Sequence, residues 1–332
     1  MPAERIRMLA RLNVPLGPTE KEQIERQGIS LLYASRLCGL IGVETEDTLA
    51  VASFPFITEC RESQKGIAQF NTALTKIGIP ALHSQALFGA GVLIAHIDSG
   101  IITQDEMTAY AYIDHEDFTG EGIDDYAMHG TITSRIMTAI APESALLNAK
   151  VIDRNGDVDE IDVLAALEWA LMKGAQLANL SLGFPRPCDG TCWLCEFVDL
   201  LSEHGLTVVA AAGNWGPQVG SVACPGNARQ AITVGATENC QIAEYSGRGL
   251  PGQGKPTMVA PGQLNIGRFR FEGTSIATPM VTGIIAALME SYDKEDVLDA
   301  LKNTCRDLGY DEHEQGAGLV NAEAALEELR ND

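Results

Sequence analysis

The chain has 332 residues, of which 45% are hydrophobic, and its formal net charge is −22 at pH 7. The length predicts one large domain and one small one, with enough apolar residues for a sizeable core. The charge argues against nucleic acid and anionic membranes as partners and favours cationic peptides, with solubility alone as the alternative reason for it.

Neither a membrane span nor a secretory signal is visible in the sequence. No stretch approaches the roughly 20 apolar residues that a spanning helix needs. Residues 1–14 spread three arginines among apolar residues, whereas a secretory signal places its basic residues before an apolar run. We therefore expect a cytoplasmic protein, or a secreted one if the natural chain begins with a signal that precedes Met1.

Residues 1–65 carry short strand and helix patterns that differ from the rest of the chain. They predict a strand at 5–14, a helix at 19–27, one or two strands at 30–44, a helix at 46–53 and a strand at 54–61. The first of these helices opens with a threonine cap. A small α+β domain is therefore expected, followed by a linker at 66–74 and a second domain over 75–332.

In the second domain, apolar runs typical of buried parallel strands alternate with helical patterns. Strands are expected at 91–100, 145–152, 176–182, 207–212 and 231–236, and helices at 159–173, 195–204 and about 275–290. This alternation predicts an α/β fold, in which helices cover both faces of a parallel sheet. The carboxyl ends of the strands are where functional side chains are expected.

Three segments supply what a serine needs to become a nucleophile. Asp98 ends the first strand, His129 lies in Met-His-Gly-Thr, and Ser275 lies in Gly-Thr-Ser-Ile-Ala-Thr-Pro. A serine hydroxyl attacks at neutral pH when a histidine takes its proton and a buried carboxylate fixes the tautomer of that histidine. His96 is expected on the same strand face as Asp98. We interpret it as a buried, hydrogen-bonded histidine, with tuning of the carboxylate as the alternative.

With these motifs and the run Ala-Ala-Ala-Gly-Asn that ends at Asn214, residues 75–328 resemble the subtilisin-like serine proteases. The resemblance implies a three-layer fold with a mostly parallel sheet, and a serine endopeptidase that forms an acyl-enzyme. It implies that Asp98 orients His129 and that His129 acts as general base and then as general acid. Ser275 would be the nucleophile. Asn214, with the backbone N–H of Ser275, would stabilise the oxyanion.

The resemblance also gives residues 1–65 a role. Their element order is similar to the ferredoxin-like propeptide that many of these proteases carry as a folding aid and inhibitor. The chain would then be a self-processing zymogen whose tail, around 59–69, lies in the cleft and is cut there. A permanent accessory domain is the alternative.

Substrate is implied to bind as an added strand between two segments, which contribute Asp157, Val158, Asp159 and Glu160 on one side and Ser181, Leu182 and Gly183 on the other. The carboxylates of the first segment favour basic residues before the scissile bond. The alternative is a solvated loop with acidic residues at a helix start. The primary pocket is implied to be bounded by Ala212, Gly213, Trp215, Ala223 and Cys224. Pro225 matches a position that is commonly cis.

The chain departs from the family in the region where secreted members insert a calcium-binding loop. No such loop fits between Ile140 and Pro142. We therefore expect no required cofactor and no tight calcium site, while the many carboxylates leave weak calcium binding open.

A cysteine-rich insertion follows the second substrate segment. It places Cys188, Cys192 and Cys195 in the spacing C-x₃-C-x₂-C. Free thiols are one interpretation, and a disulfide within the loop or to Cys224 is another, which suits an oxidising compartment. A zinc site with Cys224 as the fourth ligand is the third. Each places sulfur near the primary pocket, so the insertion is expected to shape substrate choice.

The sequence therefore predicts an endopeptidase that acts on peptides or proteins and is inhibited by its own amino-terminal segment. Nucleic acid and membranes are not expected partners. A narrower version is a cytosolic maturation protease that removes a leader from a precursor peptide. An inactive peptide-binding scaffold is the competing class of function, and the complete set of catalytic residue types counts against it.

Overall fold

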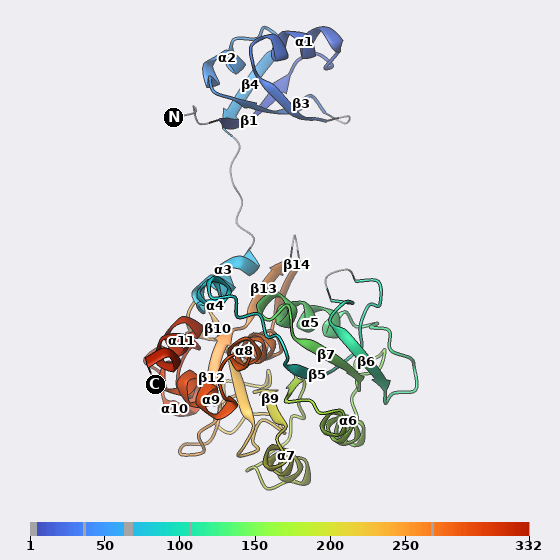
Figure 1. The fold of residues 1–332 in the computed structure, drawn as a ribbon, viewed down its shortest axis with the longest axis vertical. Helices are drawn as coiled ribbons and strands as arrows, with labels where there is room; N and C mark the ends of the chain where they lie inside the picture. Colours follow the sequence, from blue (N-terminus) through green and yellow to red (C-terminus); the bar gives the residue numbers. More distant parts are fainter. Residues whose placement is uncertain (1–4, 36–37, 63–68, 106–107, 267–268, 332) are drawn as a thin grey trace. The chain divides into compact units, whose positions relative to one another are not determined.

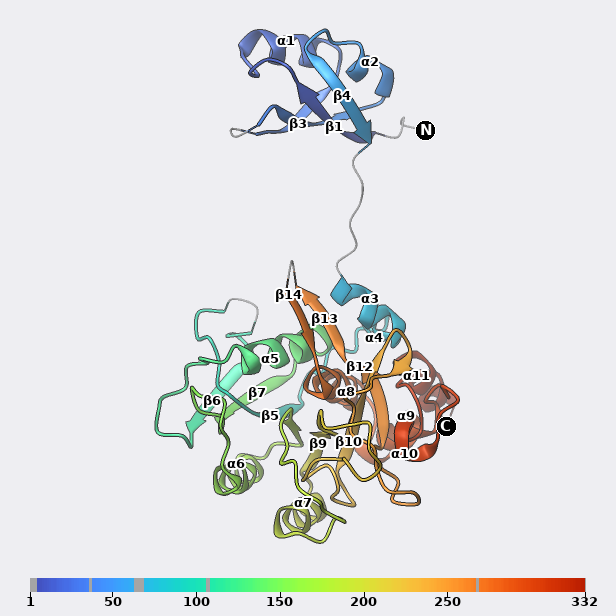
Figure 2. The same cartoon turned by 180° about the vertical axis from the view of Figure 1, so that it is seen from behind.

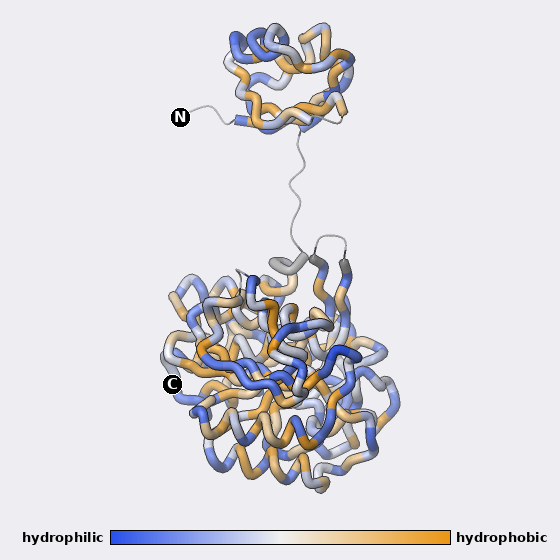
Figure 3. Tube along the Cα trace, turned by 90° about the vertical axis from the view of Figure 1, so that its right-hand side faces the viewer, coloured by the Kyte–Doolittle hydropathy of each residue, from blue (hydrophilic) through white to orange (hydrophobic). Residues whose placement is uncertain are grey.

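The computed structural model describes residues 5–35, 38–62, 69–105, 108–266 and 269–331. The chain divides into two compact units, Met1–Ile67 and Ala68–Asp332. Each unit contains its own apolar segments, drawn in orange in Figure 3, and each builds its own core from them.

The first unit has the elements β1 (Ile6–Leu12), α1 (Pro18–Arg26), β2 (Ser30–Ala34), β3 (Leu40–Thr45), α2 (Thr48–Ala52) and β4 (Ile57–Glu62). The strands form an antiparallel sheet in the order β2-β3-β1-β4. Met8, Ala10 and Leu12 alternate along β1 and face the core. The order βαββαβ is that of ferredoxin-like folds. The five elements expected in residues 5–61 are present, with two separate strands between 30 and 45. The expected threonine cap is wrong, because α1 begins at Pro18, its N-cap is Gly17, and Thr19 lies inside the first turn.

The region expected to be a linker at 66–74 differs from that expectation. Helix α3 (Gln69–Lys76) begins within it and belongs to the second unit. Ala73, Leu74 and Ile77 are buried in the core of that unit, and this burial explains why the chain is helical there. Residues 66–68 of the expected linker lie outside the described residues.

The second unit is built on an eight-stranded sheet (Figures 1 and 2). Its strands are β5 (Leu93–Asp98), β6 (Tyr112–Asp117), β7 (Ala145–Lys150), β8 (Leu177–Leu180), β9 (Thr207–Ala211), β10 (Ile232–Glu238), β11 (Gln241–Ile242) and β12 (Met258–Pro261). The order is β11-β10-β9-β8-β5-β7-β6, with β12 paired to β10. All pairs are parallel except β10 with β11.

Helices cover both faces of this sheet, as Figure 1 shows. On one face α5 (His129–Ile140) and α8 (Thr274–Met289) share a core with Ile94 of β5. On the other face α6 (Glu160–Met172) and α7 (Trp193–Glu203) share a core with Ala95 and Ile97. The alternation of β5 therefore turns Asp98 toward the side of α5 and α8. The predicted three-layer α/β fold is confirmed.

The remaining elements are α4 (Ile79–Ser84), the hairpin β13 (Gln263–Ile266) with β14 (Phe269–Glu272), α9 (Lys294–Asn303), α10 (Glu312–Gln315) and α11 (Ala322–Asn331). The strands and helices expected between 91 and 290 occur within a few residues of their predicted bounds. Sequence patterns missed β6, because its sequence Tyr-Ile-Asp-His-Glu-Asp is mostly polar. Nothing in the described parts of the chain forms a helix long and apolar enough to cross a membrane.

Candidate active site

Asp98 and His129 meet at the carboxyl end of the parallel sheet. Asp98 is the last residue of β5 and is fully buried, and His129 is the first residue of α5. The distance from His129 Nδ1 to Asp98 Oδ1 is 2.6 Å. The same carboxylate oxygen accepts a hydrogen bond of 2.7 Å from the backbone N–H of Ser99. A histidine held at Nδ1 in this way has Nε2 available to act on a nucleophile.

A chain of hydrogen bonds supports the second carboxylate oxygen of Asp98. Thr133 Oγ1 donates to Asp98 Oδ2 at 3.1 Å, and His96 Nε2 lies 2.8 Å from Thr133 Oγ1. The hydroxyl of Tyr112 lies 2.8 Å from His96 Nδ1. These contacts satisfy every polar atom if the proton of a neutral His96 is on Nε2. His96 is thus the buried, hydrogen-bonded histidine that we expected, and it also helps to lower the pKa of Asp98, which was the alternative interpretation.

The pKa values of the pair diverge. Burial opposes ionisation of Asp98, but the charge and the hydrogen bond of His129, with a smaller contribution from His96, hold the pKa of this carboxyl far below its usual value. Burial favours neutral His129, yet the charge and hydrogen bond of Asp98 raise the pKa of the imidazole above its usual 6.5. Asp98 therefore stays ionised, and His129 takes a proton more readily than a free histidine does.

Ser275 and Asn214 come from two elements that meet beside Gly273. Ser275 is the second residue of α8, which Gly273 precedes with φ 147°, a conformation that favours glycine. The side-chain oxygen of Asn214 accepts bonds of 2.9 and 3.0 Å from the N–H and hydroxyl of Thr274. A Cβ built on Gly273 would lie 3.1 Å from both Asn214 Nδ2 and Ser275 Oγ. The amide nitrogen and the serine hydroxyl therefore occupy the same small space.

Among the described residues, no hydrogen bond joins the His129 ring to the Ser275 hydroxyl, and the histidine side chain is 34% exposed. Such contacts are often long in enzymes without substrate and tighten in the complex. The structure brings all four predicted site residues to one edge of the sheet, as the order of the parallel strands requires.

The family model described as "Subtilase family" matches residues 89–318. The chain belongs to the subtilase family. It is 32% identical to M-protease of Shouchella clausii (strain KSM-K16), over 92% of this chain and 83% of that protein. It is 34% identical to subtilisin Savinase of Lederbergia lenta, over 76% of this chain and 97% of that one. These similarities identify it as a serine endopeptidase of the subtilisin type.

A solved structure has the same fold as this subtilase. The structure of prenylagaramide maturation protease PagA aligns with a TM-score of 0.65 and 25% sequence identity. The alignment covers 77% of this chain and 99% of that one. The aligned part of this chain therefore includes the counterpart of almost the whole PagA chain.

Four of the residues predicted to bound the primary pocket lie close to one another and to Gly183 of the second substrate segment. A Cβ on Gly183 would lie 2.9 Å from Ala223 Cβ, and a Cβ on Gly213 would lie 2.7 Å from the same atom. The ring of Trp215 is 2.8 Å from that position on Gly213. The backbone N–H of Ala223 donates to the carbonyl of Ala212 at 2.9 Å. The fold therefore brings these five predicted residues together from three loops.

The two residues before Gly183 are less open than the prediction of a substrate edge implied. Ser181 is 5% exposed and Leu182 is 8% exposed. The hydroxyl of Ser181 accepts a bond of 3.0 Å from Asn179, which points it inward. Only their backbones are therefore candidates for substrate contact. The bond between Cys224 and Pro225 is cis, as expected.

The first predicted substrate segment, residues 157–160, forms an acidic edge, and some of its side chains already make contacts within the protein. Asp159 caps α6 by accepting a bond of 2.8 Å from a backbone N–H of its first turn. Glu160 forms a bidentate pair with Arg186, at 2.5 and 2.9 Å. Val158 forms a β-bridge to a neighbouring loop residue. Asp157 is exposed. The alternative interpretation, in which acidic residues stabilise the start of a helix, therefore holds for Asp159.

Four sulfur atoms gather where the cysteine-rich insertion meets the pocket wall, and they belong to Cys188, Cys192, Cys195 and Cys224. Cys192 Sγ lies 3.1 Å from Cys224 Sγ, which in turn lies 3.5 Å from Cys195 Sγ. Cys188 and Cys195 are 3.6 Å apart. These distances exceed the 2.05 Å of a disulfide bond. Through the hydrogen bonds of Cys195, Cys192 and Arg186, the pKa of Cys224 falls to about 6 despite burial. Burial and the hydrogen bond with Cys224 raise the pKa values of Cys192 and Cys195.

Sequence reasoning missed Thr133 and Arg186. Thr133 follows His129 by four residues, so helical spacing places both on one face of α5 and was a usable signal. Arg186 lies in an irregular loop, and its contacts depend on how distant segments pack. No local pattern could have identified it.

The predicted calcium region is short in the structure. Helix α5 ends at Ile140 and β7 begins at Ala145, which leaves four residues between them. The expected absence of a tight calcium site stays a prediction.

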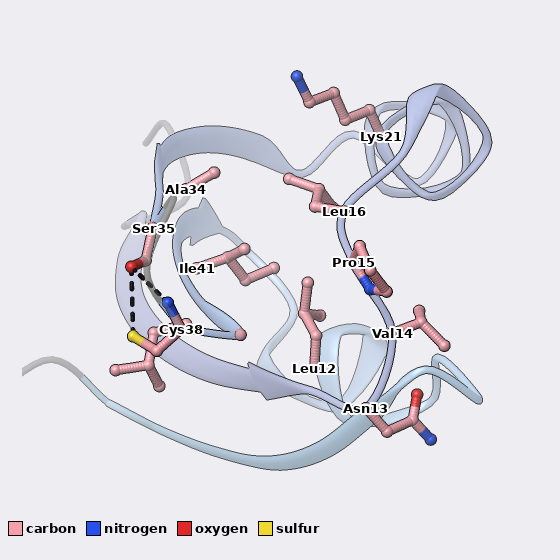
Figure 4. Close-up of a pocket in the computed structure, with 12 residues that line it drawn as sticks. Leu12, Asn13, Val14, Pro15, Leu16, Lys21, Ala34, Ser35, Cys38 and Ile41 are labelled. Atoms are coloured by element: carbon pink, nitrogen blue, oxygen red, sulfur yellow. Dashed lines mark hydrogen bonds between the residues drawn. The ribbon is translucent and has the colours of Figure 1, made fainter.

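The first unit has a hollow of about 860 Å³ (Figure 4). Leu12, Leu16 and Ile41 line it, together with Lys21 and Cys38. None of the predicted site residues lies there, and we assign it no catalytic role.

Proposed function

We propose that this subtilase hydrolyses peptide bonds with Ser275 as nucleophile, His129 as base and acid, and Asp98 as orienting carboxylate. The observation that carries the proposal is the 2.6 Å bond between His129 and buried Asp98. It leaves Nε2 of the histidine available to accept the proton of Ser275 Oγ. That oxygen attacks the scissile carbonyl, and Nε2–H then gives the proton to the leaving amine.

Asn214 is proposed to bind the negative oxygen of the tetrahedral intermediate, together with the backbone N–H of Ser275. Thr274 donates two hydrogen bonds to the side-chain oxygen of Asn214, so Nδ2 of Asn214 is the atom that is left to donate to the substrate. The amino end of α8 adds a positive partial charge to the same place. Water then attacks the acyl-enzyme, again with His129 as the base.

Labelling with a fluorophosphonate tests this assignment. The wild-type chain should be labelled and the Ser275→Ala variant should not. A Ser275→Ala chain that is still labelled would place the nucleophile elsewhere. A wild-type chain that never takes the label, full-length or without residues 1–67, would favour the peptide-binding scaffold.

We also propose that the first unit is an inhibitory propeptide. Two observations support this role. The unit has the ferredoxin-like order β2-β3-β1-β4. In addition, the similarity to M-protease covers 92% of the chain, which is more than residues 68–332 alone provide. The processing region proposed around 59–69 includes residues 63–68, which lie outside the described residues.

A maturation protease that removes a leader from a precursor peptide is the second candidate function. It is supported by the likeness to prenylagaramide maturation protease, whose chain is covered almost completely. Action in the cytoplasm would belong to this version and stays a prediction. The test is a comparison of turnover on short unstructured peptides with turnover on peptides of leader-plus-core design. Equal kcat/KM values for both sets would contradict a dedicated maturation role.

A further inference from the structure

We propose that Cys188, Cys192, Cys195 and Cys224 bind one Zn²⁺ ion that fastens the cysteine-rich insertion to the wall of the primary pocket. All four sulfur atoms lie within 4.8 Å of one another. A tetrahedral zinc ion with bonds of about 2.3 Å separates its sulfur ligands by about 3.8 Å. The observed separations of 3.1, 3.5 and 3.6 Å lie near that value.

Neighbouring donors point to thiolates and not to disulfides. Nη2 of Arg186 lies 3.5 Å from the sulfur atoms of both Cys192 and Cys224. The backbone N–H of Gly190 points to Cys188 Sγ at 3.4 Å. Four thiolates around Zn²⁺ carry a net charge of −2, and N–H donors and a guanidinium stabilise such a charge. Binding releases the thiol protons to solvent and involves no oxidant.

The cluster joins segments that are far apart in the chain. Three ligands come from one loop and the start of α7, and Cys224 comes from the segment after the pocket residue Ala223. Phe184 and Cys224 exchange backbone bonds of 2.7 and 3.1 Å, so the cluster also anchors the segment that leaves Gly183. A metal here therefore fixes one wall of the primary pocket.

Arg186 extends the effect of the cluster to the acidic edge. The same guanidinium that contacts the two sulfur atoms holds Glu160 at the start of α6. A bound metal would therefore be connected through Arg186 to Glu160, and this network would link the two proposed substrate segments. Arg186 is thus assigned as a positioning residue for the ligands and not as a catalytic residue.

The test uses the full-length chain with Ser275→Ala, so that the metal measurement is independent of peptidase chemistry. Elemental analysis should find one zinc per chain, and a mercurial that reacts with thiols should release it. In a separate sample, unfolded in the presence of a chelator and without the mercurial, all four cluster cysteines should be alkylated. Cys192→Ser should lose the metal, whereas Cys240→Ser, outside the cluster, should keep it. Arg186→Gln should bind zinc about 10–100-fold more weakly.

Two results would overturn the proposal. A denatured mass lower by the four hydrogens of two disulfides, with the cluster resistant to alkylation, would replace the metal with disulfides. Four reactive thiols with no metal, even after refolding with added zinc, would show free thiols. If Cys192→Ser fails to fold, the metal content and thiol count of the Ser275→Ala parent still decide.

Discussion

At the residue scale, the Asn214 amide has one defined orientation. Its oxygen accepts two bonds from Thr274, and its nitrogen lies near Ser275 Oγ on the same side of Gly273. A donor that is held in place before the reaction loses little on meeting the developing charge. We therefore expect Asn214 to affect turnover and not substrate binding.

Asn214→Ala should therefore lower kcat by about 10²–10³ with little change in KM, the loss already known for the oxyanion donor of subtilisin. Thr274→Val removes one of the two bonds that orient the amide and should lower kcat by less. Steady-state kinetics on a chromogenic peptide measures both. A raised KM at unchanged kcat would place Asn214 in substrate binding instead.

The acid limb of kcat/KM should reflect His129. Because Asp98 raises the pKa of this imidazole above 6.5, activity should rise with pH through a midpoint above 6.5. The pairing of His129 with Asp98 also stabilises the fold, and this stabilisation depends on pH in the opposite way. It is fully present below the pKa that His129 has in the unfolded chain, and it is lost as pH rises through the higher pKa of His129 in the folded protein.

Asp98→Asn should move the limb to lower pH and reduce kcat by about 10⁴. A pH–rate profile of both chains measures the shift. If the acid limb of kcat/KM has the same midpoint pH in the wild type and in Asp98→Asn, a group other than His129 controls the rate.

At the scale of elements, the acidic residues at the start of α6 have either a structural role or a possible role in substrate binding, which the sequence could not distinguish. Asp159 caps the amino end of the helix and Glu160 is paired with Arg186, whereas Asp157 is exposed. A carboxylate that already has a close partner is a weaker attraction for a substrate cation. Any preference for basic residues before the scissile bond should thus depend mainly on Asp157.

Cleavage of a peptide library by wild type should be enriched in Lys or Arg two to four positions before the cut. Asp157→Ala should reduce the enrichment without loss of stability. Asp159→Ala should keep the enrichment and lower the free energy of unfolding by about 1 kcal/mol, as expected for loss of an N-cap. The absence of any basic enrichment in wild type would end the idea, and the unfolding curve would still test the cap.

At the scale of the whole molecule, the division at Ile67 and Ala68 separates a ferredoxin-like unit from the subtilase unit. A propeptide should inhibit as a separate chain and be removed by the enzyme itself. The wild-type protein should therefore accumulate as two fragments cut near 59–69, while Ser275→Ala should stay intact. Intact mass analysis distinguishes these outcomes. A wild-type chain that stays whole while fully active would favour a permanent accessory domain.

Much of this protein follows from local sequence. Continuous apolar runs are enough to predict β5, β7 and β9, and helical patterns are enough to predict α6 and α8, since burial dictates the spacing of apolar residues. Asp98, His129 and Ser275 were identifiable because the chemistry of a serine nucleophile requires these residue types. Thr133 was within reach, because its distance from His129 is a helical repeat.

Other features depended on contacts between distant segments. The start of α3 within the expected linker follows from burial of Leu74 and Ile77 in the second unit. The pairing of Glu160 with Arg186 removes a carboxylate that the sequence alone offered to substrate. Cys224 joins three cysteines about 30 residues earlier only because a β-bridge sets Phe184 beside it. Sequence by itself determined the α/β order, because short-range spacing encodes it, and its motifs identified the candidate nucleophile and resembled those of the family. Tertiary structure decided which charges are free and which sulfur atoms meet, because both depend on how loops pack at the edge of the sheet.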